Sequence, residues 1–401
     1  MGGASTDPGI RTDSGTSRQH YIDWLRVLAV LLLFPFHVSR VFNAGEAFYV
    51  KSAEVSVRLD YVLGFISTWH MQLLFLLAGA STYLALGRRS GGTYLTERVN
   101  RLLVPLAFGF VVLIPPQTWI GARLNSGYTA SFWHYLVSGD WLVWSVRDGG
   151  DYFGGFGIGH LWFILILFLL SLVALPLFLL ARTGRGRQAV QIMARGLANP
   201  AWWLVPPMFI LVAENLPDPA RLHPFYYLVF FLLGYVIMAH GRFIEAAKRY
   251  RWPSLGLGVA LALFWVLSNH LRDSTPDMSW RRIGLVYLGM LATWMMLVGL
   301  LGCGKRYLDR PSPALSYLAE GSYPVYILHQ TVIVVLAFYL VGMPGPWLVR
   351  WFLLLAGSVV GTFALYEIVR RVNPLRSLFG MRAAAPAKRP RAGRRDSATQ
   401  E

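Results

Sequence analysis

The 401-residue sequence has one cysteine, few acidic residues and a small share of charged residues, 14%. Cys303 has no possible partner within the chain, which excludes an internal disulfide, and no Cys/His cluster has the spacing of a zinc site, so we expect no metal. Asp and Glu number 20 against 37 Lys and Arg, a net charge of +17. The basic residues gather in short loops and in the C-terminal segment. This pattern sets orientation in a membrane and does not indicate nucleic-acid binding.

Long apolar runs dominate the rest of the sequence. Hydrophobic residues make up 55% of the chain, and the mean hydropathy is +0.47. Several runs reach the roughly 20 residues that a helix needs to cross a bilayer, and they are too continuous for barrel strands. The sequence therefore predicts an all-α, polytopic membrane protein with about ten transmembrane helices. The expected spans are residues 21-43, 61-86, 102-120, 158-181, 201-215, 225-240, 253-271, 281-302, 318-341 and 348-370.

The orientation follows from the loops. An even number of spans puts both termini on one side, and most of the 37 Lys and Arg residues fall in segments on that side. The positive-inside rule then predicts that both termini are cytoplasmic. Pro206 and Pro207 interrupt the span 201-215, so a re-entrant pair with 225-240 remains an alternative to two full crossings.

The chain divides into three parts by composition. Residues 1-20 are polar and predict a disordered cytoplasmic tail, and residues 21-371 form the transmembrane domain. Residues 372-401 are rich in Ala, Pro, Arg and Lys. They predict a basic, disordered cytoplasmic arm lying near anionic membrane lipids.

The first span carries an arginine and a histidine on one face. Arg26 and His37 are 11 residues apart, which is three helical turns plus about 20°, and His37 lies about 16 Å deeper in the membrane. Pro35 should kink the helix beside His37. Ionisable residues at such depth usually face a pathway or a partner. In the alternative, Arg26 reaches the headgroups while paired with Asp23, and His37 only bonds a neighbouring helix.

The loop after the second span places Arg98 and Arg101 one turn apart at the cytoplasmic surface. Two guanidinium groups on one face suit phosphate, which arginine binds bidentately. The same pair is also explained as a topology signal alone.

Three further histidines lie where an outward cavity is expected. His70 and His160 belong to the outer parts of their spans, and His329 lies in the middle of the ninth span, one turn from Tyr326. Each can line a polar cavity with His37, or simply bond a neighbouring backbone or hydroxyl group and lock helices together.

These residues resemble the hallmark motifs of the acyltransferase 3 family of membrane proteins. Asp23 and Arg26 precede His37, and Arg98-x-x-Arg101 precedes Pro105. Other segments are similar to the glucan biosynthesis protein C branch of that family, and the likeness covers nearly all of residues 21-371. These segments are Trp69-His70-Met71, Ala78-Gly79-Ala80-Ser81, His160-Leu161-Trp162-Phe163 and Ser322-Tyr323-Pro324-Val325-Tyr326-Ile327-Leu328-His329-Gln330.

The resemblance implies a ten-helix O-acyltransferase without a permanently bound cofactor. Such an enzyme takes an acyl group from cytoplasmic acyl-CoA, its co-substrate, and places it on a hydroxyl of a glycan or lipid-linked acceptor at the outer face. His37 is then the catalytic residue, and Arg26, Arg98 and Arg101 bind the donor. Many family members carry Ser-Gly where this chain has Ala78-Gly79, so the acceptor does not follow by analogy. A bacterial inner membrane is the implied location.

The chemistry supports the same roles. Acyl transfer from a thioester needs a base for the acceptor hydroxyl, hydrogen-bond donors for the oxyanion and cations for the CoA phosphates. We predict His37 as general base and assign Asp23, His70, Tyr326 and His329 to substrate or donor binding. Direct transfer and an acyl-histidine intermediate both stay open. The main alternative function is a transporter or flippase for a lipid-linked glycan or amphiphile, although the sequence shows no internal repeat.

Overall fold

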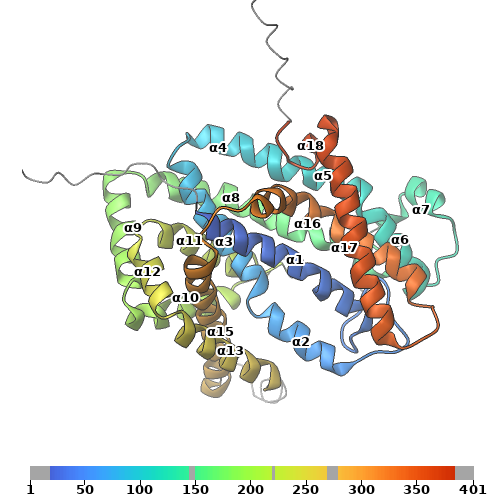
Figure 1. Ribbon diagram of the computed structural model, residues 1–401, viewed down its shortest axis with the longest axis horizontal. Helices are drawn as coiled ribbons and strands as arrows, with labels where there is room; N and C mark the ends of the chain where they lie inside the picture. Colours follow the sequence, from blue (N-terminus) through green and yellow to red (C-terminus); the bar gives the residue numbers. More distant parts are fainter. Residues whose placement is uncertain (1–18, 144–149, 219–221, 269–278, 384–401) are drawn as a thin grey trace, which may run out of the picture.

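The computed structural model describes residues 19–143, 150–218, 222–268 and 279–383, and within these ranges the fold is helical (Figure 1). The described residues contain a single isolated β-bridge, Asn43 with Ser56, and no strand. Mostly apolar helices satisfy their own backbone hydrogen bonds, as a lipid environment requires. The predicted all-α polytopic membrane fold is confirmed.

Among the described residues, seven helical segments are long and apolar enough to cross a membrane. They are α1 (His20–Phe42), α2 with α3 (Val57–Ser67, His70–Leu86), α4 to α6 (Gly91–Arg98, Val104–Val112, Ile114–Asn125, with a π-helical turn at Val99–Leu103), α8 (Trp162–Leu180), α15 (Trp280–Cys303), α16 (Pro313–Leu340) and α17 (Trp347–Arg371). Counting two bent pairs gives nine, and α13 (Arg251–Leu267) is a shorter apolar helix. The ten expected spans each correspond to one of these elements.

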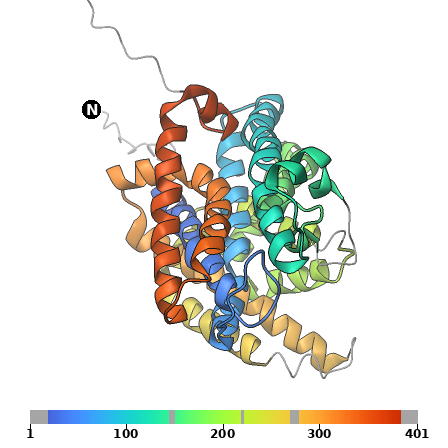
Figure 2. The same ribbon diagram turned by 90° about the vertical axis from the view of Figure 1, so that its right-hand side faces the viewer.

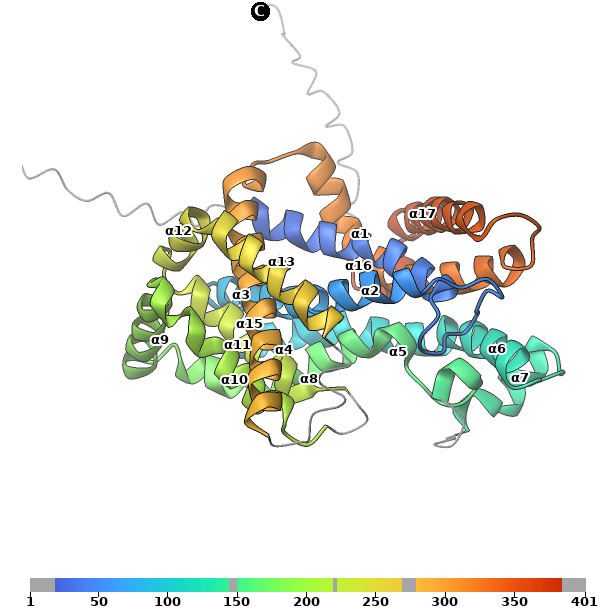
Figure 3. The same cartoon turned by 90° about the horizontal axis from the view of Figure 1, so that it is seen from below.

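Two helix pairs in the middle of the chain are sharply bent, in the region where the sequence left a re-entrant pair open. Helix α9 (Gly184–Leu197) meets the segment Pro200–Glu214, which ends in α10 (Val205–Glu214), at 97°. Helix α11 (Pro224–Met238) meets α12 (Arg242–Arg249) at 102°. The apolar members α10 and α11 match the expected spans 201-215 and 225-240. Their basic partners α9 and α12 pack against each other and cover one end of the bundle (Figure 3).

Both ends of the described chain lie at the same end of the bundle, which we call the inner end (Figure 2). The backbone N–H of Tyr21 donates to Asp309 at 3.4 Å, and Arg376 pairs with Glu320 at 2.9 Å. These contacts join the start of α1, the start of α16 and the residues after α17. The opposite end, which carries residues 43–56, 126–143 and 150–158, is called the outer end. The positive-inside rule predicts that the inner end is cytoplasmic.

Small residues let α3 and α11 approach closely. A Cβ added to Gly79 would lie 1.9 Å from the carbonyl oxygen of Phe231, and one added to Gly234 would lie 2.0 Å from that of Leu76. Glycine at such contacts is a common device of helix packing in membranes. This pairing fixes the position of α3, which carries Ser81 and His70.

The chain does not leave the bundle at Arg371. Helix α18 (Asn373–Leu378) follows at once, and the buried Arg376 bonds Glu320, the carbonyl of Arg370 and the carbonyl of Arg382. Residues 372–383 of the expected disordered arm are therefore a folded part of the inner end, and this corrects the predicted boundary. The rest of that arm and most of the expected N-terminal tail lie outside the described residues.

Candidate active site

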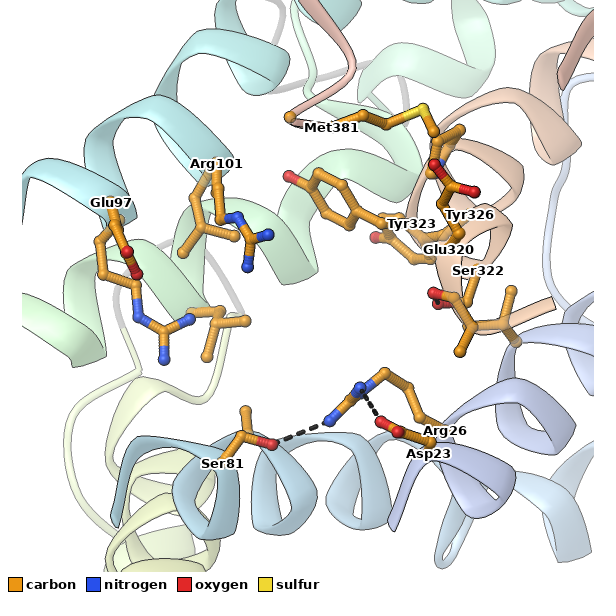
Figure 4. A pocket seen from close by; sticks show the side chains of 18 of the residues that line it. Asp23, Arg26, Ser81, Glu97, Arg101, Glu320, Ser322, Tyr323, Tyr326 and Met381 are labelled. Carbon is orange, nitrogen blue, oxygen red and sulfur yellow. Dashed lines mark hydrogen bonds and ion pairs between the residues drawn. The ribbon is translucent and has the colours of Figure 1, made fainter. Parts of the chain in front are cut away.

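A cavity of about 800 Å³ opens at the inner end and is lined mainly by α1, α3, α4, α8 and α16 (Figure 4). Six arginines face it against three acidic residues, so its walls carry an excess of positive charge. The arginines are Arg26, Arg89, Arg98, Arg101, Arg376 and Arg382, and the acids are Asp23, Glu97 and Glu320. A basic, half-enclosed cavity of this kind suits a polyanionic ligand.

Arg26 is held in place from two sides. Its guanidinium pairs with Asp23 at 3.1 Å and donates to the Ser81 hydroxyl at 2.8 Å (Figure 4). Asp23 lies one turn earlier on α1, and Ser81 lies on α3. These partners leave the guanidinium little freedom, so Arg26 lines the cavity in a fixed orientation.

Arg98 and Arg101 lie on the opposite wall. Arg98 donates to the Thr82 hydroxyl at 2.9 Å and lies over the Tyr94 ring, 4.8 Å from its centre. Arg101 belongs to the π-helical turn and forms no hydrogen bond or ion pair with the residues that the structure describes. Its guanidinium points toward the centre of the cavity (Figure 4). Arg101 is therefore the arginine of this pair that is free to bind a ligand.

Tyr326 forms the deep end of the cavity. It lines the cavity one turn beyond Tyr323 on α16, and its hydroxyl donates to the backbone carbonyl of His160. The Tyr323 hydroxyl is buried without a hydrogen-bond partner among the described residues. The Tyr326 hydroxyl is thus already hydrogen-bonded, whereas the Tyr323 hydroxyl is available to a ligand.

Three histidines from three helices meet next to Tyr326, and we call them the histidine trio: His37, His160 and His329. The ring centres of His37 and His329 are 5.1 Å apart, and those of His160 and His329 are 5.3 Å apart. The ring of Tyr326 lies 5.8 Å from His329. Since His37 comes from α1, His160 from the turn before α8 and His329 from α16, only the folded bundle assembles the trio.

The protonation of two trio rings follows from their partners. His160 Nε2 lies 2.8 Å from the carbonyl oxygen of Ile327, and His329 Nδ1 lies 2.5 Å from that of Tyr326. A carbonyl only accepts, so in each neutral ring the bonded nitrogen carries the proton. The other nitrogens, His160 Nδ1 and His329 Nε2, are therefore buried lone-pair atoms without a described partner, and His37 Nδ1 is also buried without a described partner. The trio thus holds three buried ring nitrogens without hydrogen-bond partners among the described residues, and such groups often mark a site of chemistry.

The predicted site residue His70 and the nearby Gln330 mainly join helices. His70 is buried, bonds the carbonyl of Ala29 at 2.7 Å and stacks on Phe36, 6.4 Å between ring centres. Gln330 donates to Gln117 at 3.0 Å and so joins α16 to α6. His70 therefore supports α1 near His37 and is not a member of the trio.

Two loops cap the trio at the outer end. The Phe48 ring lies 6.2 Å from His37, and Tyr49 beside it donates its hydroxyl to Asp151. Burial raises the pKa of the Asp151 carboxyl above its usual range, despite the hydrogen bond from Tyr49 that opposes this shift. Burial also lowers the pKa of the Lys51 amine to about 8. The loops that cap the trio therefore hold partly desolvated polar groups.

The structure brings together most of the predicted site residues. Asp23, Arg26, Arg98, Arg101 and Tyr326 line one cavity, and His37 and His329 meet beyond it. Sequence reasoning placed His160 near the expected cavity without assigning it a role in the site, and it left out Tyr323, Arg376 and Arg382. His160 had a signal, because a histidine opened an apolar helix. The residues after α17 gave no such signal in the sequence, because their composition resembles that of a disordered tail.

Comparison with known proteins identifies this multi-pass membrane protein as an acyltransferase. The family model described as an acyltransferase domain matches residues 19–367, so the chain belongs to the acyltransferase 3 family. Its relatives include proteins named glucans biosynthesis protein C from Salmonella paratyphi A and Salmonella agona, each 24% identical over 384 residues, covering 90% of this chain and 94% of the relative. No solved structure matches the chain.

Proposed function

We propose that this protein transfers an acyl group from cytoplasmic acyl-CoA to a hydroxyl of a glycan on the far side of a bacterial inner membrane. The observation that carries the proposal is the arrangement of two sites in series. An arginine-lined cavity opens at the basic inner end, and its deep end contacts the histidine trio, which lies under the outer cap. The names of the relatives support a glucan as acceptor.

The donor is assigned by charge and shape. CoA carries several phosphate charges at one end of a long, flexible molecule and its thioester at the other. Arg26, Arg98 and Arg101 would bind the phosphates near the cavity mouth. The chain of the donor then extends along α1 and α16 and brings the thioester carbonyl to Tyr326. About 16 Å separates Arg26 from His37 along α1, so an extended donor is required.

His37 acts as the general base in this mechanism. It removes the proton from the acceptor hydroxyl as the oxygen attacks the thioester carbon, the C–S bond breaks, and the proton passes to the leaving thiolate of CoA. The Tyr323 hydroxyl, which has no hydrogen-bond partner among the described residues, is the available donor for the oxyanion. The bond of His329 Nδ1 to the Tyr326 carbonyl fixes the His329 ring, whose centre lies 5.1 Å from that of His37.

The test uses the full chain in lipid bilayers with radiolabelled acetyl-CoA or succinyl-CoA and a purified glucan. We expect labelled glucan with the wild type and none above background with His37→Ala. A transporter or flippase would instead move glycan across the bilayer without any acyl transfer from either donor, and that result would overturn the proposal.

A further inference from the structure

A second cavity, which we call the outer cavity, lies between the outer halves of α2, α3, α11, α13 and α15. Its volume is about 510 Å³, within the range of small-molecule sites. It shares none of its described lining residues with the inner cavity. Figure 1 shows α2, α13 and α15 together at one end of the molecule, away from α4 and α18. A ligand there would approach from the outer side.

One buried polar atom in this cavity lacks a partner. The Gln72 side chain is 5% exposed, and its Nε2 donates to the carbonyl of Ser67 at 3.2 Å and to the Tyr226 hydroxyl at 3.0 Å. Because the Ser67 carbonyl only accepts, the amide nitrogen must face it, and this fixes the orientation of the amide. The opposite atom, Oε1, has no hydrogen bond among the described residues. This oxygen can accept a hydrogen bond from a hydroxyl or amide group of a ligand.

The charged groups at the rim are already engaged. Asp60 accepts from the side chain of Asn43 at 2.6 Å and from the backbone of Ala44 and Gly45. Glu214 lies 3.8 Å from His223. Two acids at the rim disfavour an anionic ligand, and their existing partners leave little free charge for a cation. The cavity therefore suits a neutral, hydrogen-bonding ligand.

The remaining walls are aromatic. Tyr226, Tyr227 and Trp265 line the cavity together with the hydroxyl groups of Thr68 and Thr293. A sugar ring presents C–H groups on its faces and hydroxyls around its edge, so aromatic faces and scattered hydrogen-bonding groups are complementary to it.

The rim also has an unusual backbone conformation. His223 adopts φ 47°, and it is the one non-glycine residue with positive φ in the described part of the chain. Asp218 holds it there, accepting from its backbone N–H at 2.6 Å and lying 3.2 Å from its ring. Non-glycine residues persist in this region only when their surroundings enforce it, commonly at functional sites.

We propose that the outer cavity is a carbohydrate-binding site, distinct from the histidine trio, which holds a neutral sugar unit of the glycan. As a role in the reaction, this rests on the proposed function, because the bound glycan would be the acceptor. Asp60 links the two regions: it lines the outer cavity and bonds the loop that follows α1, the helix of His37. Sugar bound here would keep neighbouring units of the same chain near the trio.

Binding is tested without any acyl donor, by calorimetric titration of the full chain in lipid nanodiscs with neutral gluco-oligosaccharides. Trp265→Leu and Gln72→Met should each weaken binding about tenfold. Trp133→Leu is the matched control, because Trp133 is 71% exposed on α7 (Phe132–Ser138) outside the cavity, and it should bind like wild type. No saturable sugar binding, tighter binding of a quaternary ammonium ion, or wild-type affinity in both cavity variants would overturn the proposal.

Acyl transfer separates this inference from the proposed function. In the transfer assay, Trp265→Leu should raise the KM for glucan with little change in kcat, because the residue lies away from the trio. Sugar binding without acyl transfer would retain the outer cavity and reject the acyltransferase assignment. Acyl transfer with an unchanged KM in Trp265→Leu would reject the outer cavity alone.

Discussion

At the scale of residues, the histidine trio places two buried lone-pair nitrogens, His160 Nδ1 and His329 Nε2, close to the His37 ring. Such an arrangement is unfavourable unless a ligand or a reacting proton satisfies it. His37 differs from the other two because no described backbone carbonyl fixes its ring. It is therefore the member best placed to change its proton during a reaction cycle.

Replacing His37 tests this directly. His37→Gln keeps a donor and an acceptor but cannot take up a proton near neutral pH, so turnover should fall about 10²–10⁴-fold. Binding of acyl-CoA should be unchanged, since the arginines are about 16 Å away along the helix. Equilibrium binding and single-turnover transfer, measured on the same preparation, check both expectations. Near-normal turnover in His37→Gln together with an inactive His329→Gln would move the base to His329.

The arginines of the inner cavity are predicted to differ in their roles. Arg101→Ala removes a guanidinium without described partners, so it should weaken acyl-CoA binding about tenfold or more while leaving the unfolding temperature unchanged. Arg98→Ala should also lower stability, because it breaks the bond to Thr82.

Arg185→Ala provides the control for both arginine variants, because Arg185 is exposed on α9 outside the cavity. Binding is measured by titration with a non-hydrolysable acyl-CoA analogue. Wild-type affinity in the double variant Arg98→Ala/Arg101→Ala would show that these arginines serve orientation in the membrane and not the donor.

At the scale of elements, the contact of α3 with α11 positions one wall of the inner cavity. Gly79→Ala would force a methyl group to within 1.9 Å of the Phe231 carbonyl oxygen, so the helices must separate. We expect a loss of about 1–3 kcal/mol in stability, typical of overpacking. Gly256→Ala in α13 meets no atom within 4 Å and should be neutral. Thermal unfolding in detergent compares the two, and equal stability would contradict the close packing.

Helical elements were largely predictable from the sequence, because a long apolar run has few alternatives in a membrane. The face shared by Arg26 and His37 also followed from helical periodicity. Three features did not follow: the π-helical turn at Arg101, the bends beside α9 and α12, and the meeting of His160 with His329. Each depends on contacts between helices that are distant in sequence. The fold of residues 372–383 was predicted wrongly, because the buried contacts of Arg376 leave no mark in composition.

At the scale of the whole molecule, the orientation remains a prediction from the distribution of basic residues. In a Cys303→Ala background, Gly92→Cys should react with a membrane-impermeant reagent from the cytoplasmic side and Gly342→Cys from the opposite side. A Cβ at either position meets no atom within 4 Å, whereas Gly345 has φ +118° and would be strained. Labelling of both positions from one side would reverse or invalidate the proposed direction of transfer.

The bond from Tyr326 to the His160 carbonyl has one further consequence, for the electrical integrity of the membrane. Any protein with a water-accessible cavity on one side and titratable rings next to it risks becoming a proton leak, driven by a potential worth about 2.3 kcal/mol per charge at 100 mV. Tyr326 lines the deep end of the cavity, and its ring lies 5.8 Å from that of His329, so the phenol stands between the cavity and the trio. We therefore expect Tyr326→Ala to raise the passive proton flux, measured in proteoliposomes that carry a pH-sensitive dye. A proton flux equal to that of the wild type would show that other residues block proton passage.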